Sequence, residues 1–188
     1  HPDKYGFSLL LTNPPFGRGR DKNVRDRERL IHFENPVAKD RQGNPRTDIG
    51  ADMQSLFLEL SLRLLKPGGR AAIIIDDGIL GNLTMPWGPQ RGGELVYLRL
   101  REWFLEHAVI RGIISLPPKA FEPYGSGAKT SILIFQRKSA LVQRQDKVFF
   151  GRARYVGYKL QRHKYEPIEQ NDLPYIAQQF RAYLHKYG

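Results

Sequence analysis

Three short apolar segments of this chain are each followed at once by proline, asparagine or aspartate residues that end a strand. This pattern constrains the fold more than any other feature. The segments are 7–12, 70–75 and 109–116, followed by Asn-Pro-Pro, Asp-Asp and, after Leu116, Pro-Pro. Runs of this length and apolarity are typical of buried strands, and such prolines and aspartates mark their ends. A fourth apolar run, at 130–135, predicts a fourth strand.

Helical patterns alternate with these strands. Asp52 can cap a helix whose apolar residues recur at helical spacing as far as the Lys-Pro-Gly-Gly turn at 66–69. A second helix is predicted near 94–107, and a later strand and helix at 147–150 and 173–186. This alternation predicts an α/β fold with a doubly wound sheet.

The ends of the first three strands should lie close together. Right-handed crossovers would make these strands parallel, so their carboxyl ends would share one edge of the sheet, where such sheets bind ligands. Asn13, Asp77 and Pro117 follow the three strands in turn. The sequence therefore predicts that these residues lie together at a functional edge.

The tetrapeptide Asn13-Pro14-Pro15-Phe16 is the candidate catalytic motif. An amine on an aromatic ring is a poor nucleophile because its lone pair is delocalised into the ring. The side-chain carbonyl of Asn13 and the backbone carbonyl of Pro14 could hold its two N–H groups and localise that lone pair. Pro15 would keep both acceptors aimed, and a base that has left the duplex could stack on Phe16. A purely rigid turn after the strand is the alternative interpretation.

The chain resembles the adenine-N6 DNA methyltransferases, in particular the modification subunits of type I restriction–modification systems. The resemblance implies part of a class I (Rossmann-like) methyltransferase fold, with a mostly parallel sheet and a terminal antiparallel hairpin strand. It implies transfer of a methyl group from S-adenosylmethionine to N6 of adenine in DNA, with specificity and restriction subunits as partners. The segments that carry the resemblance are 11–17, 65–70, 76–80, 116–124, 127–135 and 171–174.

The resemblance also implies roles for individual residues. Asn13 and Pro14 would bind the target amine, with Asn13 near the cofactor, and Phe16 and Phe121 would sandwich the adenine across a base-sized gap. Lys129 and Thr130 would orient the hairpin or contact a phosphate. The alternatives are a core aromatic residue at 121, a solvated lysine at 129 and a plain turn at Asp76-Asp77.

Residues 1–138 are expected to form the carboxyl half of a catalytic domain, and 139–188 a basic tail with a strand and a helix. Most of residues 17–50 is expected to form a long basic surface loop, with a weak helix around 24–33 as an alternative for part of it. Because the segment lacks periodicity, we expect it to be mobile or partly unresolved without DNA. The family's Gly-rich cofactor loop precedes the motif, but only twelve residues do so here. We therefore expect an incomplete cofactor pocket, and no methylation by the isolated chain.

The positive charge is concentrated in two segments. Of a net charge of +11, 17–50 carries nine Lys and Arg against six Asp and Glu, and 137–188 carries eleven against four. Such flanks suit a polyanion, and a solubilising surface is the alternative. We expect weak, salt-sensitive DNA binding by the isolated chain, with these tail candidates: Arg152, Arg154, Lys159, Arg162 and Lys164.

Other chemistries find little support. The chain has no cysteine, which excludes disulfides and thiolate-bound zinc and fits a cytoplasmic protein. The histidines lack metal-ligand spacing, and no apolar run is long enough to cross a membrane. Residues 125–130 lack the glycines and the helix of a phosphate-binding loop. The open alternatives are a methyltransferase acting on ribosomal RNA or protein glutamine, or a non-catalytic module for nucleic-acid binding or assembly.

Overall fold

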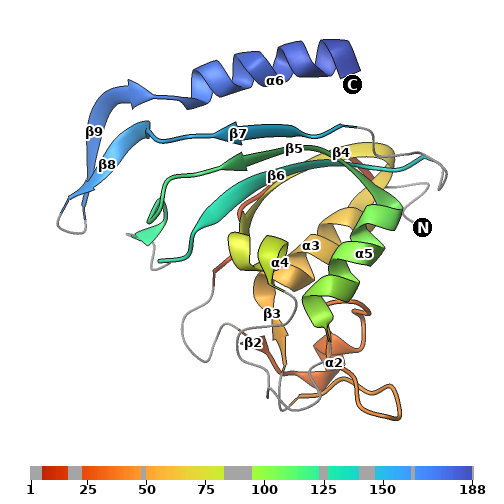
Figure 1. The fold of residues 1–188 in the computed structure, drawn as a ribbon. Helices are drawn as coiled ribbons and strands as arrows, with labels where there is room; N and C mark the ends of the chain where they lie inside the picture. The colour runs from red at the N-terminus through yellow and green to blue at the C-terminus, as the bar shows by residue number, and fades with distance from the viewer. Residues whose placement is uncertain are drawn as a thin grey trace.

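The computed structural model describes residues 6–16, 23–47, 50–82, 95–122, 127–139, 147–161 and 164–187. Its main sheet has five strands in the order β1-β4-β6-β5-β7 (Figure 1). The strands are β1 (Phe7–Thr12), β4 (Leu65–Asp76), β6 (Thr130–Arg137), β5 (Ala108–Ser115) and β7 (Phe149–Arg152).

Strand directions agree with the sequence prediction. β1 is parallel to β4 and β5 is parallel to β7, whereas β6 lies antiparallel between β4 and β5. β1, β4, β5 and β7 therefore all point the same way, and the mostly parallel sheet with one antiparallel hairpin strand is confirmed. The strand expected at 147–150 is displaced by two residues and becomes β7.

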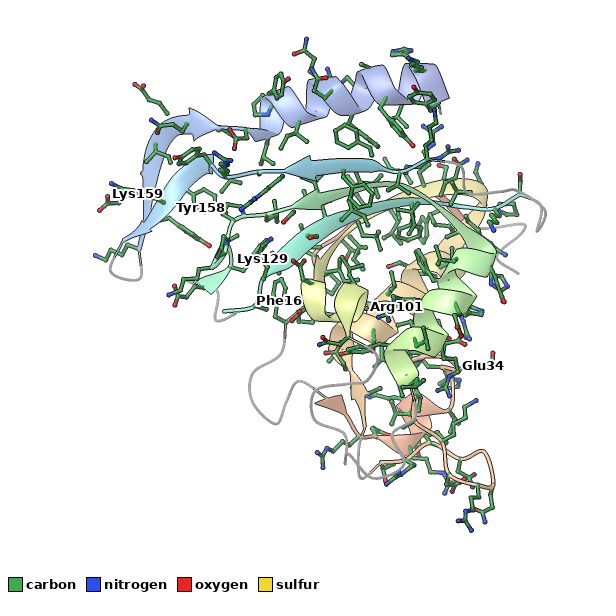
Figure 2. All side chains as sticks on the ribbon, viewed as in Figure 1. Phe16, Glu34, Arg101, Lys129, Tyr158 and Lys159 are labelled. Carbon is green, nitrogen blue, oxygen red and sulfur yellow. The ribbon has the colours of Figure 1, made fainter. Side chains whose placement is uncertain are left out.

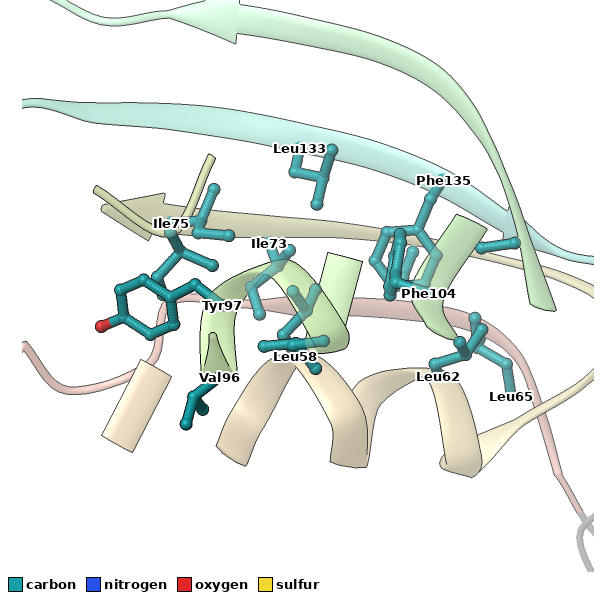
Figure 3. Close-up of a cluster of buried hydrophobic side chains, with 14 of the residues drawn as sticks. Leu58, Leu62, Leu65, Ile73, Ile75, Val96, Tyr97, Phe104, Leu133 and Phe135 are labelled. Atoms are coloured by element: carbon teal, nitrogen blue, oxygen red, sulfur yellow. The ribbon is translucent and has the colours of Figure 1, made fainter. Parts of the chain in front are cut away.

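The main core lies between the sheet and two helices, α3 (Met53–Leu64) and α5 (Val96–His107), on one face (Figures 1 and 3). Asp52 caps α3 as predicted, because its carboxylate accepts a hydrogen bond from the Ser55 backbone N–H at 3.0 Å. Phe104 of α5 packs edge-on against Phe135 of β6, with ring centroids 4.8 Å apart. The sheet is thereby held on a rigid helical layer.

The opposite face of the sheet carries α6 (Leu173–Tyr187) (Figure 1). Ile176 of α6 packs against Ile114 and Ala153. Gly151 permits this close approach, since a Cβ there would lie 3.0 Å from Ile176 Cγ2. The tail therefore adds a strand and a helix to the sheet as expected, and α6 covers the part of the second face formed by β5 and β7.

Sequence reasoning missed a hairpin formed by β8 (Val156–Gln161) and β9 (Lys164–Asn171). It extends beyond the carboxyl ends of the main strands (Figure 1). Pro167 lies within β9, and proline inside a run argues against a strand. The expectation of a tail with one strand was therefore incomplete.

The expectation of a surface loop over 17–50 is wrong for its central part. The described residues include β2 (Asn23–Val24), which pairs with β3 (Ala51–Asp52), and the short α2 (Arg27–Leu30). Residues 35–38 are buried. Leu30 and Val37 join Ala51 and Leu56 in a second small core. Mobility of 17–50 without DNA stays a prediction.

Glu59 of α3 fixes this segment to the domain. Its side chain is fully buried and accepts hydrogen bonds from the Asn35 backbone and side-chain amides at 2.9 and 3.2 Å. Arg63 forms an ion pair with Glu59, and Arg99 of α5 donates to the Val37 carbonyl at 2.8 Å. These contacts explain how a charged stretch of chain becomes ordered against the helices. No described helix is long and apolar enough to cross a membrane.

Candidate active site

The carboxyl edge of the sheet gathers the residues that sequence reasoning placed there. Asn13 follows β1, Asp77 follows β4, and Pro117 lies just beyond β5. β6 enters at the same edge, where Thr130 pairs with Asp76 and Ser131 with Ser115. The predicted common edge is confirmed.

The residues of the Asn-Pro-Pro-Phe motif, which follows β1, differ in their exposure to solvent. Asn13 and Pro15 are exposed, Pro14 is buried, and Phe16 is half-buried. Because Pro14 is held in the protein while Asn13 faces solvent, the Asn13 amide is open to an incoming group. Within the described part of the chain, no hydrogen bond occupies that amide.

Phe16 meets Phe121, which comes from the turn between β5 and β6. Their ring centroids are 5.1 Å apart and their planes are inclined at 38°. This separation is that of two aromatic rings in direct contact, so the predicted base-sized gap between them is absent. The prediction that the two rings face each other is correct, but in this structure they pack on one another and cover each other's apolar surface.

Asp77, Lys129, Ser131 and Ser115 form a polar network at the same edge of the sheet. Asp77 Oδ1 accepts a hydrogen bond from Ser131 Oγ at 2.7 Å, and Lys129 Nζ lies 3.6 Å from Asp77 Oδ2. Lys129 Nζ also donates to Ser115 Oγ at 2.6 Å. Figure 2 shows Lys129 at the same end of the molecule as Phe16. The network ties the ends of β4 and β5 to the start of β6, so Lys129 is not merely a solvated side chain.

The residues of this network fall into predicted and missed groups. Lys129 was predicted, whereas Ser115 and Ser131 were not, because a serine at a strand end carries no distinctive signal. Thr130, also predicted, is fully buried. A direct phosphate contact is therefore closed to Thr130 in this structure, and its place in β6 fits the other predicted role, orienting the hairpin.

Asp76 and Asp77 do not form a plain turn. Asp76 caps the short helix α4 (Asp77–Gly81), accepting from the Gly78 backbone N–H at 2.7 Å. Its own N–H donates to Gln54 Oε1 at 2.7 Å. Nearby, burial raises the pKa of Tyr97, and the carboxylates of Asp52 and Asp76 raise it further. Tyr97 therefore remains a neutral phenol and is not a proton acceptor for the site.

The basic tail contributes two arginines close to this edge. Arg152 ends β7, where it pairs with Ser115, and Arg154 follows two residues later. Both are exposed and border a groove of about 500 Å³ between β7 and α6. Lys159 instead forms an exposed ion pair with Glu166 at 3.7 Å, and Arg162 lies outside the described residues. Lys164 is exposed at the start of β9, and Arg152 and Arg154 are the tail candidates that lie at the carboxyl edge of the main sheet.

The cofactor contact expected at Asn13 stays a prediction in this structure. β1 is the outer strand of the sheet in the described residues, and Asn13, which follows it, is exposed. An amide with both donor and acceptor groups suits a polar cofactor. We assign the described residues no other cofactor contact. They contain no group of three or more His, Asp or Glu residues that could hold a metal ion.

Known proteins resemble this chain in sequence. Two curated relatives are methylase subunits of type I restriction enzymes from Escherichia coli. The EcoEI subunit is 31% identical over 129 residues, which cover 69% of this chain and 21% of the relative. The EcoKI subunit of strain K12 is 26% identical over 139 residues, covering 74% and 20%. The chain thus spans about a fifth of the length of these relatives.

A solved structure shares the fold. It is the methyltransferase subunit of a type I restriction-modification system from Streptococcus thermophilus, with a TM-score of 0.57 and 20% identity. The match covers 96% of this chain and 32% of that one. A family model described as N-6 DNA Methylase matches residues 1–187. This chain belongs to the N-6 DNA methylase family.

Proposed function

We propose that the protein containing this chain methylates N6 of adenine in DNA as the modification subunit of a type I restriction–modification system. The observation that carries the proposal is the motif at the end of β1, with an open Asn13 amide and with Phe16 packed against Phe121. Family membership and the names of the relatives support it.

Asn13 and Pro14 would activate the amine. The Asn13 side-chain carbonyl and the Pro14 backbone carbonyl each accept one N–H of adenine N6, which turns the lone pair out of the ring. S-adenosylmethionine, when bound, supplies the methyl group on a sulfonium sulfur. Asn13 and Pro14 would hold the amine in place for this group, and the donor would leave as its neutral thioether. The methylated nitrogen is cationic and therefore acidic, so it would release its proton to water without a strong base.

Phe16 and Phe121 would receive the adenine after it leaves the duplex. Because their rings touch in this structure, they must separate as the base enters, and each ring then exchanges its partner for a face of the base. Pro15 stiffens the turn on the Phe16 side. The pocket is thus closed by its own aromatic pair until a base replaces that contact.

The other subunits belong to the same proposal. The relatives are named as subunits of restriction enzymes, and we propose that this protein acts with a specificity subunit and a restriction subunit in the cytoplasm. Sequence recognition would then lie outside this chain, whose exposed Arg152 and Arg154 would contact DNA phosphates without reading bases.

Truncating the stacking ring tests the base pocket. Phe121→Ala in the full-length enzyme should weaken capture of the flipped base roughly tenfold, as one base–aromatic stack contributes about 1–3 kcal/mol. The measurement is fluorescence of 2-aminopurine at the target position, which rises when the base leaves the duplex and falls when it stacks on a ring. Tyr187→Ala, an exposed aromatic truncation at the end of α6, is the control. Unchanged fluorescence with Phe121→Ala would remove Phe121 from the pocket.

The tail arginines make a second prediction. In the double variant Arg152→Ala/Arg154→Ala, the slope of log affinity against log salt should fall by about two, one for each lost phosphate contact. Filter binding at several salt concentrations measures it. Lys66→Ala/Arg70→Ala removes the same charge from exposed positions at the amino end of β4 and should leave the slope nearly unchanged. Equal effects of both double variants would assign the binding to net charge instead.

A further inference from the structure

We propose that Tyr165 of the β8–β9 hairpin is a positioning residue that holds the Phe121 turn, with Tyr158 in support; this rests on the proposed role of Phe121 in stacking adenine. Tyr165 Oη donates a hydrogen bond to the backbone carbonyl of Ala120 at 2.5 Å, and Tyr158 Oη lies 3.5 Å from the same oxygen. Ala120 is 5% exposed and directly precedes Phe121.

The turn itself needs such support. Lys119 has φ +63°, the only positive φ of a non-glycine residue in the described part of the chain. A lysine in this region of φ is strained and persists only where neighbouring contacts hold it. Within the turn, Ala120 N donates to the Pro117 carbonyl at 3.3 Å and Glu122 N to the Lys119 carbonyl at 3.0 Å. The contact from Tyr165 adds a restraint from a distant part of the chain.

The two tyrosines form a stiff pair. Tyr158 pairs with Pro167 and Leu160 with Tyr165, so the tyrosines are diagonal neighbours across the hairpin. Their rings meet edge to face with centroids 4.4 Å apart. Figure 2 shows Tyr158 at the same end of the molecule as Lys129 and Phe16. Their hydroxyl groups therefore reach the turn from one rigid surface.

The base of the hairpin is anchored to the main sheet. Asp172 accepts hydrogen bonds from the Arg154 and Tyr155 backbone N–H groups at 2.7 and 3.0 Å. Ala153 N donates to the Ser115 carbonyl at 2.9 Å, which joins the same stretch of chain to the end of β5. The hairpin thus fixes the backbone on one side of Phe121, while β5 fixes the start of the turn.

This arrangement has a consequence for base entry. With the Ala120 carbonyl held, Phe121 can leave Phe16 by rotating its side chain while the backbone beside it stays in place. A preorganised backbone restores the same ring position once a base is bound. The tail then contributes to catalysis through the pocket, as well as through charge.

The test is Tyr165→Phe in the full-length enzyme, which removes one hydroxyl and keeps the ring. A lost hydrogen bond of ordinary strength corresponds to about a fivefold effect. We expect 2-aminopurine at the target position to be quenched less and kcat/KM to fall about fivefold, while the thermal unfolding midpoint falls by no more than a few degrees. Tyr158→Phe should lower kcat/KM less, because the Tyr158 hydroxyl is farther from the Ala120 carbonyl. Tyr175→Phe, on an exposed ring, is the matched control.

A double-mutant comparison separates positioning from general damage. If Tyr165 acts through Phe121, then Tyr165→Phe should cause no further loss when Phe121 is already Ala. Additive losses, or a Tyr165→Phe enzyme that behaves as wild type while Phe121→Ala is impaired, would overturn the proposal and leave the base pocket intact. If Phe121→Ala is itself without effect, the proposed stacking role of Phe121 is wrong, and a positioning role for Tyr165 has no basis.

Discussion

Asn13→Ala in the full-length enzyme should lower the single-turnover rate of methyl transfer by about 10²–10³-fold, the usual cost of removing one preorganised acceptor or donor at a reacting group. DNA affinity should change little, because the exposed Asn13 side chain has no partner among the described residues and supports no part of the fold. Rapid-quench methylation assays and filter binding measure the two quantities separately.

A second variant and a stability measurement serve as controls for Asn13→Ala. Asn13→Asp keeps an acceptor at the same position, so it should retain more activity than Asn13→Ala. The unfolding midpoint of both variants should match the wild type. Equal losses in methylation rate and in DNA affinity would instead mean that Asn13 shapes the binding surface, and the proposed activation of the amine would lose its main support.

The active-site edge was predictable because its signals are local. Asn-Pro-Pro, Asp-Asp and Pro-Pro end their strands through backbone restrictions that depend on only a few residues. The Asp52 cap is likewise local, since its carboxylate bonds an amide three residues away. Strand direction then follows from the handedness of crossovers. Together these rules brought Asn13, Asp77 and Pro117 to one edge.

The prediction that Phe16 and Phe121 face each other came from the family resemblance. The direct contact between their rings could not be predicted. The two residues are far apart in sequence, and local patterns do not set the distance between rings. Their direct contact depends on how β1 and the turn after β5 pack in three dimensions. The network that joins Asp77 to Lys129, Ser131 and Ser115 was hidden for the same reason, because its members come from three separate segments.

The predictions for the two basic segments were wrong or incomplete where charged residues form ordered structure. Residues 23–47 lack periodicity, yet Glu59 and Arg99 supply long-range hydrogen bonds that order them. The β8–β9 hairpin contains a proline and many charges, so neither its pairing nor the reach of Tyr165 to Ala120 follows from composition. Both errors concern contacts between elements, which are set by tertiary packing.

The second large effect concerns the buried carboxylate that holds the 23–47 segment. Glu59→Ala removes the acceptor for the backbone and side-chain amides of Asn35 and the partner of Arg63. Buried donors that lose a charged acceptor destabilise a structure by about 2–3 kcal/mol, or roughly 30- to 150-fold in an opening equilibrium. Because Arg63 is partly exposed and can turn to water, the loss should fall mainly on residues 33–38.

Hydrogen exchange followed by mass spectrometry tests this in the full-length enzyme. Peptides covering 33–38 should exchange roughly 30- to 150-fold faster in Glu59→Ala, while peptides from β4 and β6 stay protected. Glu102→Ala removes an exposed carboxylate from α5 and should change neither region. Faster exchange throughout the sheet would mean that Glu59 supports the whole domain, whereas unchanged exchange at 33–38 would show that the small core around Leu30 and Val37 holds the segment without it.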